Sequence, residues 1–392
     1  MNDRPGVRNV ARRELRRIGA RPLYPMLLIV LPLLSFGLLW TIFAAGTIED
    51  LPIAVIDLDR TPLSRQLVRM LDASPAMAVT QQVGSGKAAE QLMLTGDVYG
   101  AVLIPPDLAR DVYRGVPAVV TVYRNSQFMS PSSVIRRGTL AVVGTLSAGI
   151  EINQREARGE APAIARQRYE PVRTDIRPLF NPWLNYIYFL VSSLLPTMLQ
   201  IFVIVTAVHA VGVELKDGTG RQWLAAADGR VMRAVVGKML PYAIVFSALS
   251  IFMIALILTF LGVPFHGNLP ALIVGTLLFV LACQGLGVLV AACFANLRLA
   301  TSSAAFLASP AFAFAGLTFP TAAMPPFASA WSMLLPLTHY LRVVVEQMMR
   351  GAPPTASLPE LWVLVGFGVL APLLARPRLA HVLVDERYWG RR

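Results

Sequence analysis

Long apolar stretches alternate with polar stretches along the chain, and six of the apolar stretches are long enough to cross a membrane. A helix needs about 20 apolar residues to span a hydrocarbon core of roughly 30 Å. The pattern therefore predicts an α-helical polytopic membrane protein with six transmembrane helices. The predicted spans are residues 23–45, 183–211, 234–262, 269–295, 299–319 and 358–375.

The first span ends in small residues, Ala44, Ala45 and Gly46, of the kind found at signal-peptide cleavage sites. Its apolar run is longer than the roughly 7–15 residues of a signal-peptide core. We therefore expect a retained helix, preceded by a basic segment at residues 1–22.

The polar segment between the first two spans, residues 46–182, has the pattern of an inserted α/β domain. Ile53–Asp57 is a short apolar run suited to a buried strand. Thr61 and Pro62 then begin a helix, because Thr is a favoured N-cap and Pro is favoured at the first helical position. Such alternation predicts helices packed on a small sheet. The other predicted elements are strands at 76–80, 99–104 and 118–123, helices at 87–94, 105–113 and 132–156, and an irregular connector at 158–178.

Residues 320–357, between the fifth and sixth predicted spans, hold an apolar run too short to cross the membrane and a longer amphipathic run. We expect a hairpin and an interfacial amphipathic helix on the outer side of the membrane. The alternative is one more crossing. That crossing would place the basic C-terminus outside, against the preference of Lys and Arg for the cytoplasmic side.

The chain has few charged residues, and basic residues outnumber acidic ones. The chain is 55% hydrophobic and 15% charged, with a net charge of +12, whereas a soluble domain is about 25% charged. Outside the inserted domain, the basic residues gather at 1–22, in the loop 212–233 and in the tail 376–392, and the many arginines of the inserted domain carry no topology signal because long domains are translocated regardless of charge. Short cytoplasmic loops are enriched in Lys and Arg, so both termini are predicted to be cytoplasmic and the inserted domain extracytoplasmic. The basic residues thus indicate membrane topology and not nucleic-acid binding.

The apolar cores of the first five spans contain no Asp, Glu, Lys or Arg, and Glu360 near the start of the sixth is the exception. Ion-driven transporters need ionisable groups at membrane depth. We therefore expect that any transport by this protein is powered by another chain.

Catalytic and cofactor motifs are weak. The run from Gly84 to Lys87 is similar to a phosphate-binding loop, but Gln81 and Ala88 stand where that motif needs Gly and Ser or Thr. The four histidines are scattered without metal-ligand spacing. The two cysteines, Cys283 and Cys293, lie about 15 Å apart on one helix, too far for a disulfide. We predict no catalytic residue, no metal site and no cofactor bound by this chain.

The loop after the second span is polar but carries an apolar pair, Trp223 and Leu224. A short helix with such a pair is suited to docking in a groove of a partner protein. It is equally suited to lying on the membrane with Trp223 as an interfacial anchor. The residues leave both interpretations open.

This loop and several other motifs resemble those of the permease subunits of type-2 ABC exporters, in order along nearly the whole chain. The family has an acidic residue, a Gly-Thr pair and a Leu in this loop, and a Gly-Lys pair at the start of the third helix. Arg221 departs from the pattern, because the family usually has a second acidic residue after Gly-Thr. The matching residues are Glu214, Gly218, Thr219, Leu224, Gly237 and Lys238.

Two further segments carry the resemblance. Pro336–Leu341, with Arg342, is similar to the family's outer motif before the last helix. The runs at 55–64 and 100–106 resemble the extracytoplasmic domain of the multidrug-export branch. The outer-motif candidates are Pro336, Leu337, Thr338, Tyr340 and Arg342, and the ATPase-coupling candidates are Glu214, Gly218, Thr219, Trp223 and Leu224.

The resemblance implies one half of an exporter of amphiphilic, drug-like or lipid-like cargo. Two permeases, either copies or paralogues, would pair in a bacterial inner membrane, surrounded by lipid. Each would dock a cytosolic ABC ATPase that binds ATP and Mg²⁺, and a periplasmic adaptor is a further implied partner. The competing hypothesis is a non-transport receptor or envelope-assembly scaffold whose outer domain binds a ligand or partner.

Overall fold

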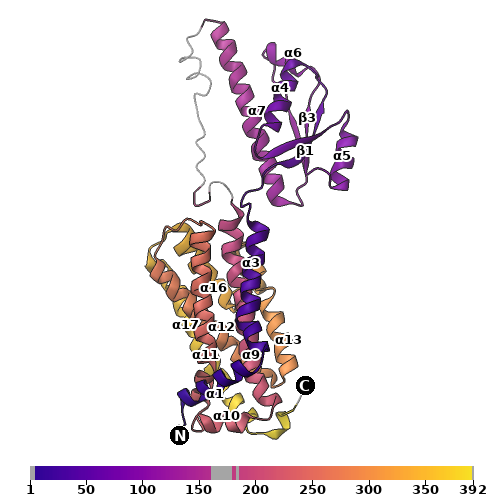
Figure 1. Cartoon of the computed structure of the whole chain (residues 1–392). Coiled ribbons are helices and arrows are strands. Elements are labelled where there is room, and N and C mark those ends of the chain that lie inside the picture. Colours follow the sequence, from indigo (N-terminus) through magenta and orange to yellow (C-terminus); the bar gives the residue numbers. More distant parts are fainter. Residues whose placement is uncertain (1–4, 160–178, 182–184, 391–392) are drawn as a thin grey trace. The chain divides into compact units, whose positions relative to one another are not determined.

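The computed structural model describes residues 5–159, 179–181 and 185–390. The chain divides into two compact units (Figure 1). One unit combines residues 1–46 with residues 178–392, and the other comprises residues 47–177. The predicted connector at 158–178 lies almost entirely outside the described residues.

The first unit is helical. Its N-terminal part contains α1 (Val7–Ala20), α2 (Leu23–Pro25), η1 (Met26–Val30) and α3 (Leu31–Phe43). Its middle contains η2 (Ile187–Val191), α9 (Ser192–Lys216), α10 (Gly220–Ala226), α11 (Val231–Ala255), η3 (Leu256–Phe260) and α12 (Leu269–Phe294). Its C-terminal part contains α13 (Leu297–Ala308), α14 (Ala311–Phe314), η4 (Thr321–Ala323), α15 (Pro326–Met333), α16 (Pro336–Val344), η5 (Val345–Arg350), η6 (Pro354–Ser357), α17 (Leu358–Val382) and η7 (Glu386–Tyr388).

Five helices of the described chain are long and apolar enough to cross a membrane, so the chain is a polytopic helical membrane protein. They are Leu23–Phe43, Ile187–Lys216, Val231–Phe260, Leu269–Phe294 and Pro354–Val382. The predicted span at 299–319 is not one helix. There α13 ends at Ala308, and the short α14 follows Pro310. Proline lacks the N–H that would continue the helix, and Gly316, with φ 84°, turns the chain again.

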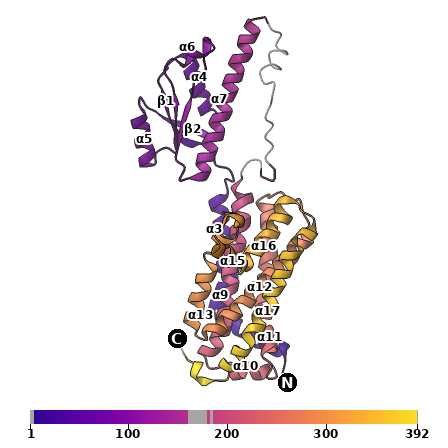
Figure 2. The same cartoon turned by 180° about the vertical axis from the view of Figure 1, so that it is seen from behind.

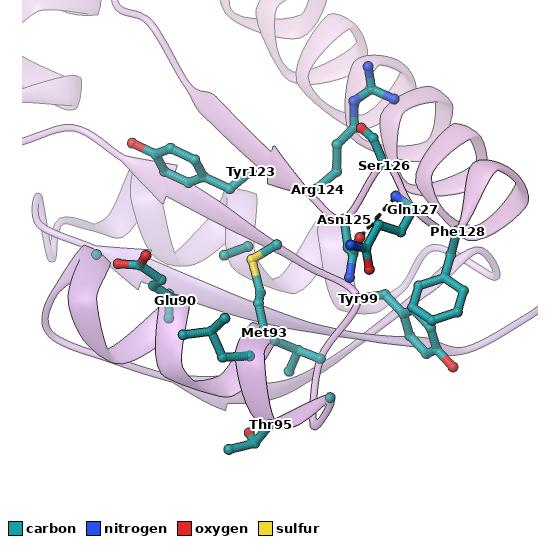
Figure 3. Close-up of a pocket in the computed structure, with 16 residues that line it drawn as sticks. Glu90, Met93, Thr95, Tyr99, Tyr123, Arg124, Asn125, Ser126, Gln127 and Phe128 are labelled. Atoms are coloured by element: carbon teal, nitrogen blue, oxygen red, sulfur yellow. Dashed lines mark hydrogen bonds between the residues drawn. The ribbon is translucent and has the colours of Figure 1, made fainter.

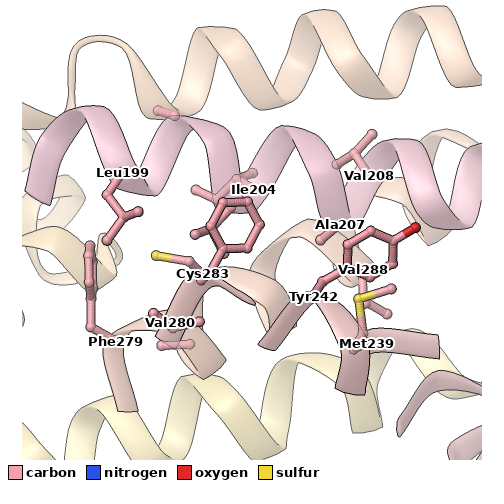
Figure 4. Close-up of a cluster of buried hydrophobic side chains, with 14 of the residues drawn as sticks. Leu199, Ile204, Ala207, Val208, Met239, Tyr242, Phe279, Val280, Cys283 and Val288 are labelled. Atoms are coloured by element: carbon pink, nitrogen blue, oxygen red, sulfur yellow. The ribbon is translucent and has the colours of Figure 1, made fainter. Parts of the chain in front are cut away.

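The core of the helical unit is built around α12, which contacts α9, α11, α13, α16 and α17. Figure 4 shows the interface between α9 and α12, where Ile204 lies near Cys283 and Ala207 lies near Val288. Two glycines of α12 allow its neighbours to approach closely. A Cβ on Gly287 would lie 2.7 Å from the Cβ of Ala207, and one on Gly285 would lie 2.7 Å from the Phe367 oxygen of α17. Small residues at such contacts are typical of helices packed within a membrane.

Helix α16 differs from the interfacial helix expected in 320–357. All of its residues except Arg342 are buried. Its Tyr340 stacks on Phe279 of α12, with ring centroids 4.4 Å apart, and shares a 2.9 Å hydrogen bond with Thr276. The polar positions that make the sequence amphipathic are therefore used inside the protein, and no polar face is left for water.

The second unit contains a four-stranded sheet in the order β2-β1-β3-β4, close to the predicted strand positions. The central strand β1 is parallel to β2 and β3, and β4 is antiparallel to β3. The strands are β1 (Leu51–Asp57), β2 (Met77–Gln82), β3 (Gly100–Ile104) and β4 (Thr121–Arg124), and the helices are α4 (Pro62–Asp72), α5 (Gly86–Thr95), α6 (Leu108–Tyr113) and α7 (Met129–Ala157).

The helices cover the two faces of this sheet unequally. Helices α4 and α7 pack on the face that carries Ile53 and Val55 of β1, whereas α5 alone packs on the face that carries Ala54 and Ile56 (Figures 1 and 2). The predicted N-cap is confirmed, because the Thr61 side chain accepts a hydrogen bond from the backbone N–H of Ser64. Because α5 alone packs on the face of Ala54 and Ile56, the part of that face beside β4 is not covered by any described helix.

Candidate functional site

The five ATPase-coupling candidates lie at the corner where α9 turns into α10. Helix α9 ends at Lys216, and Gly218 takes a left-handed conformation, with φ 67°, that favours glycine. The backbone N–H of Thr219 then donates to the Glu214 carbonyl at 2.9 Å, which closes the turn. The Gly-Thr pair therefore shapes the corner, and α10 begins directly after it.

The Glu214 carboxylate is buried and lies at the centre of a charged cluster. Arg13 of α1 binds it with two hydrogen bonds, of 2.7 and 2.9 Å. Arg17 and the Thr219 hydroxyl also donate to it, and Lys238 of α11 donates at 2.8 Å. Burial opposes the charge on Arg17, but the neighbouring Glu214 and Glu14 more than offset this, and the Arg17 pKa is raised.

A second carboxylate, Glu14 of α1, completes the cluster. It accepts hydrogen bonds from Lys238 and, at 2.6 Å, from the Tyr242 hydroxyl. Glu14 and Lys238 are both fully buried. We define the charged cluster as Glu14, Glu214, Arg13, Arg17 and Lys238. Buried charges are tolerated only when paired and hydrogen-bonded, and here each carboxylate is held by several donors.

Trp223 and Leu224 do not form the exposed pair that the sequence predicts. The Trp223 side chain is buried, donates from Nε1 to the Ala234 carbonyl at 3.1 Å and lies under the Lys238 ammonium. It is therefore an internal support of α10 and not an anchor in lipid. Leu224 is half-buried, and the exposed side of α10 carries Arg221, Gln222 and Ala225.

Sequence reasoning missed the contribution of α1. Glu14 and Lys238 are 224 residues apart, and no local pattern connects them. One signal was present: the Gly-Lys pair at the start of α11. A Cβ on Gly237 would lie 2.7 Å from the Val7 oxygen and from the Val10 Cβ of α1, so glycine is needed for α1 to approach. Lys238 also lies within a span, so the spans are not free of ionisable groups.

The outer-motif candidates gather around α16. Pro336 begins the helix, and Leu337 is buried. The Thr338 hydroxyl lies 3.3 Å from the Ser332 hydroxyl. Arg342 donates to Glu360 of α17 at 2.9 Å, and His339, which was not a candidate, binds the other oxygen of Glu360. The motif therefore joins α16 to α17 through one carboxylate.

A groove of about 1020 Å³ lies on the thinly covered face of the α/β unit (Figure 3). Met93 and Glu90 of α5 line one side, and Tyr123 of β4 lines the other. Tyr99 and Phe128 meet edge to face at one end, with ring centroids 5.6 Å apart. The Arg124 guanidinium is occupied by a 2.8 Å hydrogen bond to Ser132. The groove is mainly apolar and aromatic, with a carboxylate on its rim.

Metal and phosphate chemistry find no support in the described part of the chain. No group of three His, Cys, Asp or Glu side chains there is placed to hold a metal ion. In the phosphate-loop-like segment, the Ser85 side chain caps the N-terminus of α5 by accepting from the Ala88 N–H. The segment is thus a capped turn before a short helix.

Comparison with known proteins gives one family. Residues 25–375 match the model of the ABC-2 family transporter protein. The inner membrane transport permease YhhJ of Escherichia coli K12 is 23% identical over 351 residues, which cover 86% of this chain and 89% of that protein. The probable multidrug ABC transporter permease YbhR of the same strain is 22% identical, covering 90% and 92%. The linearmycin resistance permease protein LnrN of Bacillus subtilis 168 is 21% identical, covering 91% and 94%.

Proposed function

This chain belongs to the ABC-2 transporter family and is a membrane permease of that kind, and we propose that it exports amphiphilic cargo with energy from a separate cytosolic ATPase. The ATPase would bind ATP and Mg²⁺, and its closure would move the membrane helices between inward and outward states. Two permeases, either copies or paralogues, would form the complete path.

The observation that carries this proposal is the charged cluster beneath α10. Glu214 lies near the end of α9, Lys238 lies about two turns into α11, and Arg13 and Arg17 belong to α1, which leads into the first span. Glu14, Glu214 and Lys238 of this cluster are buried, and several charge-assisted hydrogen bonds hold them and the two partly buried arginines in one arrangement. A displacement of α10 by a docked ATPase would therefore be passed together to α1 and to the membrane helices α9 and α11. This is the mechanical property that a coupling element needs.

We infer the topology from the same end of the molecule. The basic helix α1 and the basic loop 212–233 support a cytoplasmic placement of both termini. In Figure 1, α1 and α10 lie at one end of the helical unit. The α/β unit would then lie on the periplasmic side of the inner membrane, where an adaptor would meet it.

An apolar groove of about 300 Å³ supports an amphiphilic cargo. It lies between α11, α12 and α17, and Leu240, Leu281 and Val369 are exposed beside it. Gln284 is the one side chain with a polar end group that lines it. Such a surface, within helices long enough to span the membrane, would accept an acyl or aromatic moiety from the bilayer. The names of two relatives, a probable multidrug ABC transporter permease and a linearmycin resistance permease protein, fit the same cargo class.

A second candidate function rests on the groove of the α/β unit. Its volume and aromatic lining suit a ligand-binding receptor or an envelope-assembly scaffold that needs no ATPase. The two functions differ in one measurement. An exporter consumes ATP with its partner and moves cargo in vesicles, whereas a receptor or scaffold does neither.

The deciding experiment places a charge on the exposed side of α10. Ala225→Asp should abolish stimulation of the co-purified ABC ATPase while the protein still inserts and unfolds normally, because Ala225 is exposed and a buried carboxylate is not created. Ala73→Asp, on an exposed position of the α/β unit, is the matched control and should leave stimulation unchanged. Full stimulation of the ATPase by the Ala225→Asp variant would contradict the coupling role of α10.

A further inference from the structure

The end of the chain folds back onto the coupling corner. We define the C-terminal tail as Leu383–Gly390, the segment that follows α17. Its last described residue donates from the Gly390 N–H to the Leu215 carbonyl of α9 at 3.1 Å. The tail therefore returns to the corner where α9 becomes α10.

Arg221 of α10 holds the tail with three different interactions. Its Nη1 lies 3.2 Å from Glu386, its Nη2 donates to the Val384 carbonyl at 3.1 Å, and its guanidinium lies 5.3 Å from the ring centroid of Trp389. Arg221 is the position where this chain departs from the acidic residue of its family. Within the same chain, the positive charge of Arg221 is paired with Glu386 and lies over the Trp389 ring.

Two glycines of the corner make room for the tail. A Cβ on Gly220 would lie 2.6 Å from the Leu383 oxygen, so the tail backbone passes directly against α10. A Cβ on Gly218 would lie 3.5 Å from the Trp389 ring, which is ordinary contact. Tyr388 steadies the tail from the other side, because the Arg378 guanidinium of α17 lies 5.2 Å from its ring centroid. The close approach is therefore part of the fold.

The small size of α10 indicates why the C-terminal tail packs against it. A stable protein–protein interface buries roughly 800 Å² on each partner, from about 20–30 residues. Helix α10 has 7 residues, and Gly220 and Trp223 among them are buried. It is too small to form such an interface alone. The tail lies against it and exposes Val384, Glu386 and Arg387.

We propose that the C-terminal tail and α10 form one continuous docking surface for the ATPase, with Arg221 and Trp389 joining its two halves. This inference rests on the proposed function and names the part of the chain that completes its contact. Around this surface the exposed positive groups of Lys216, Arg221, Arg230 and Arg387 outnumber the exposed carboxylates of Asp217, Asp228 and Glu386 by one. We expect the matching surface of the ATPase to carry a net acidic charge.

Site-specific crosslinking tests the surface without removing any buried side chain. The photoreactive p-benzoylphenylalanine is placed at Gln222 on α10, at Arg387 on the tail and at Tyr113 in the α/β unit. These positions are all exposed, and the Arg387 side chain is 81% exposed. The probe is the ABC ATPase that co-purifies with the full-length chain and carries a phosphate-binding loop. Crosslinks are expected from positions 222 and 387, and none from position 113.

The outcomes separate this inference from the proposed function. Crosslinks from 222 without any from 387 would mean that α10 docks alone, which overturns the composite surface and leaves the permease proposal standing. Crosslinks from neither position would overturn both.

A charge exchange provides a second, independent measurement. Arg221→Glu should weaken ATPase binding by roughly fivefold, and Arg221→Glu with Glu386→Arg should recover most of it, because the opposite charges are restored. Arg110→Glu, which breaks an equally exposed pair with Asp107, is the matched control. Equal binding by all four proteins would contradict the role of the tail.

Discussion

Two polar clusters join membrane helices in this permease, and they are built differently. At the α10 corner, two carboxylates and three cations from α1, α9 and α11 are gathered in a site where Glu14, Glu214 and Lys238 are buried. Around α16, one carboxylate, Glu360, binds His339 and Arg342, and Arg342 is about one-third exposed. The first cluster joins three helices and the second joins two neighbours.

The difference in burial between the two clusters indicates which helix contacts are rigid. Removing one member of a fully buried charged group leaves its partners uncompensated and costs several kcal/mol, whereas water replaces lost partners at a partly exposed site. We therefore expect the α10 corner to move as one body. The α16–α17 contact can open at lower cost.

The strongest test of this contrast is Glu214→Gln. The change keeps the shape of the side chain but leaves Arg13, Arg17 and Lys238 with one carboxylate between them. We expect a loss of about 3–5 kcal/mol in the free energy of unfolding and loss of ATPase stimulation. Unfolding in detergent, followed by circular dichroism against denaturant, measures the first quantity. A variant as stable as the parent would show that the cluster is not tightly held.

A smaller effect is expected from Glu360→Gln. This change removes the charge that His339 and Arg342 share, but Arg342 retains contact with solvent. We expect a loss of about 1–2 kcal/mol. The same denaturant titration measures it, and a loss equal to that of Glu214→Gln would erase the contrast between the clusters.

The finest comparison uses one chemical change at both sites. Thr219→Val removes a hydroxyl that donates to the Glu214 carboxylate, and Thr338→Val removes one that meets the neutral Ser332 hydroxyl. Hydrogen bonds to charged groups contribute about 1.5–3 kcal/mol and neutral ones about 0.5–1.5 kcal/mol. Thr219→Val should therefore be the more damaging of the two in paired thermal melts. The reverse order would contradict the assignment of charge to the α10 corner.

The sequence predicted those features that depend on local pattern. The apolar runs located five spans, and the strand at Ile53–Asp57 and the cap at Thr61 appear where expected, because burial and capping follow from neighbouring residues. The fifth predicted span is not confirmed as one helix, because mean apolarity does not register the turn at Pro310.

The sequence predicted where the coupling corner lies but not which side chains contact one another there. The resemblance located Glu214, but its partners Arg13 and Arg17 lie in α1, about two hundred residues away, where only three-dimensional packing brings them together. The burial of Trp223 was also beyond reach, because an apolar residue in a polar loop has the same pattern whether it faces lipid, a partner or its own core.

The place of α1 has a consequence for how the protein is made. Its first helix leaves the ribosome early, but the lysine that neutralises Glu14 follows 224 residues later. At roughly 5–20 residues per second, that lysine arrives on the order of ten seconds or more after the glutamate. The nascent α1 must wait for Lys238 through that interval, so α1 is among the last parts to be secured during biosynthesis.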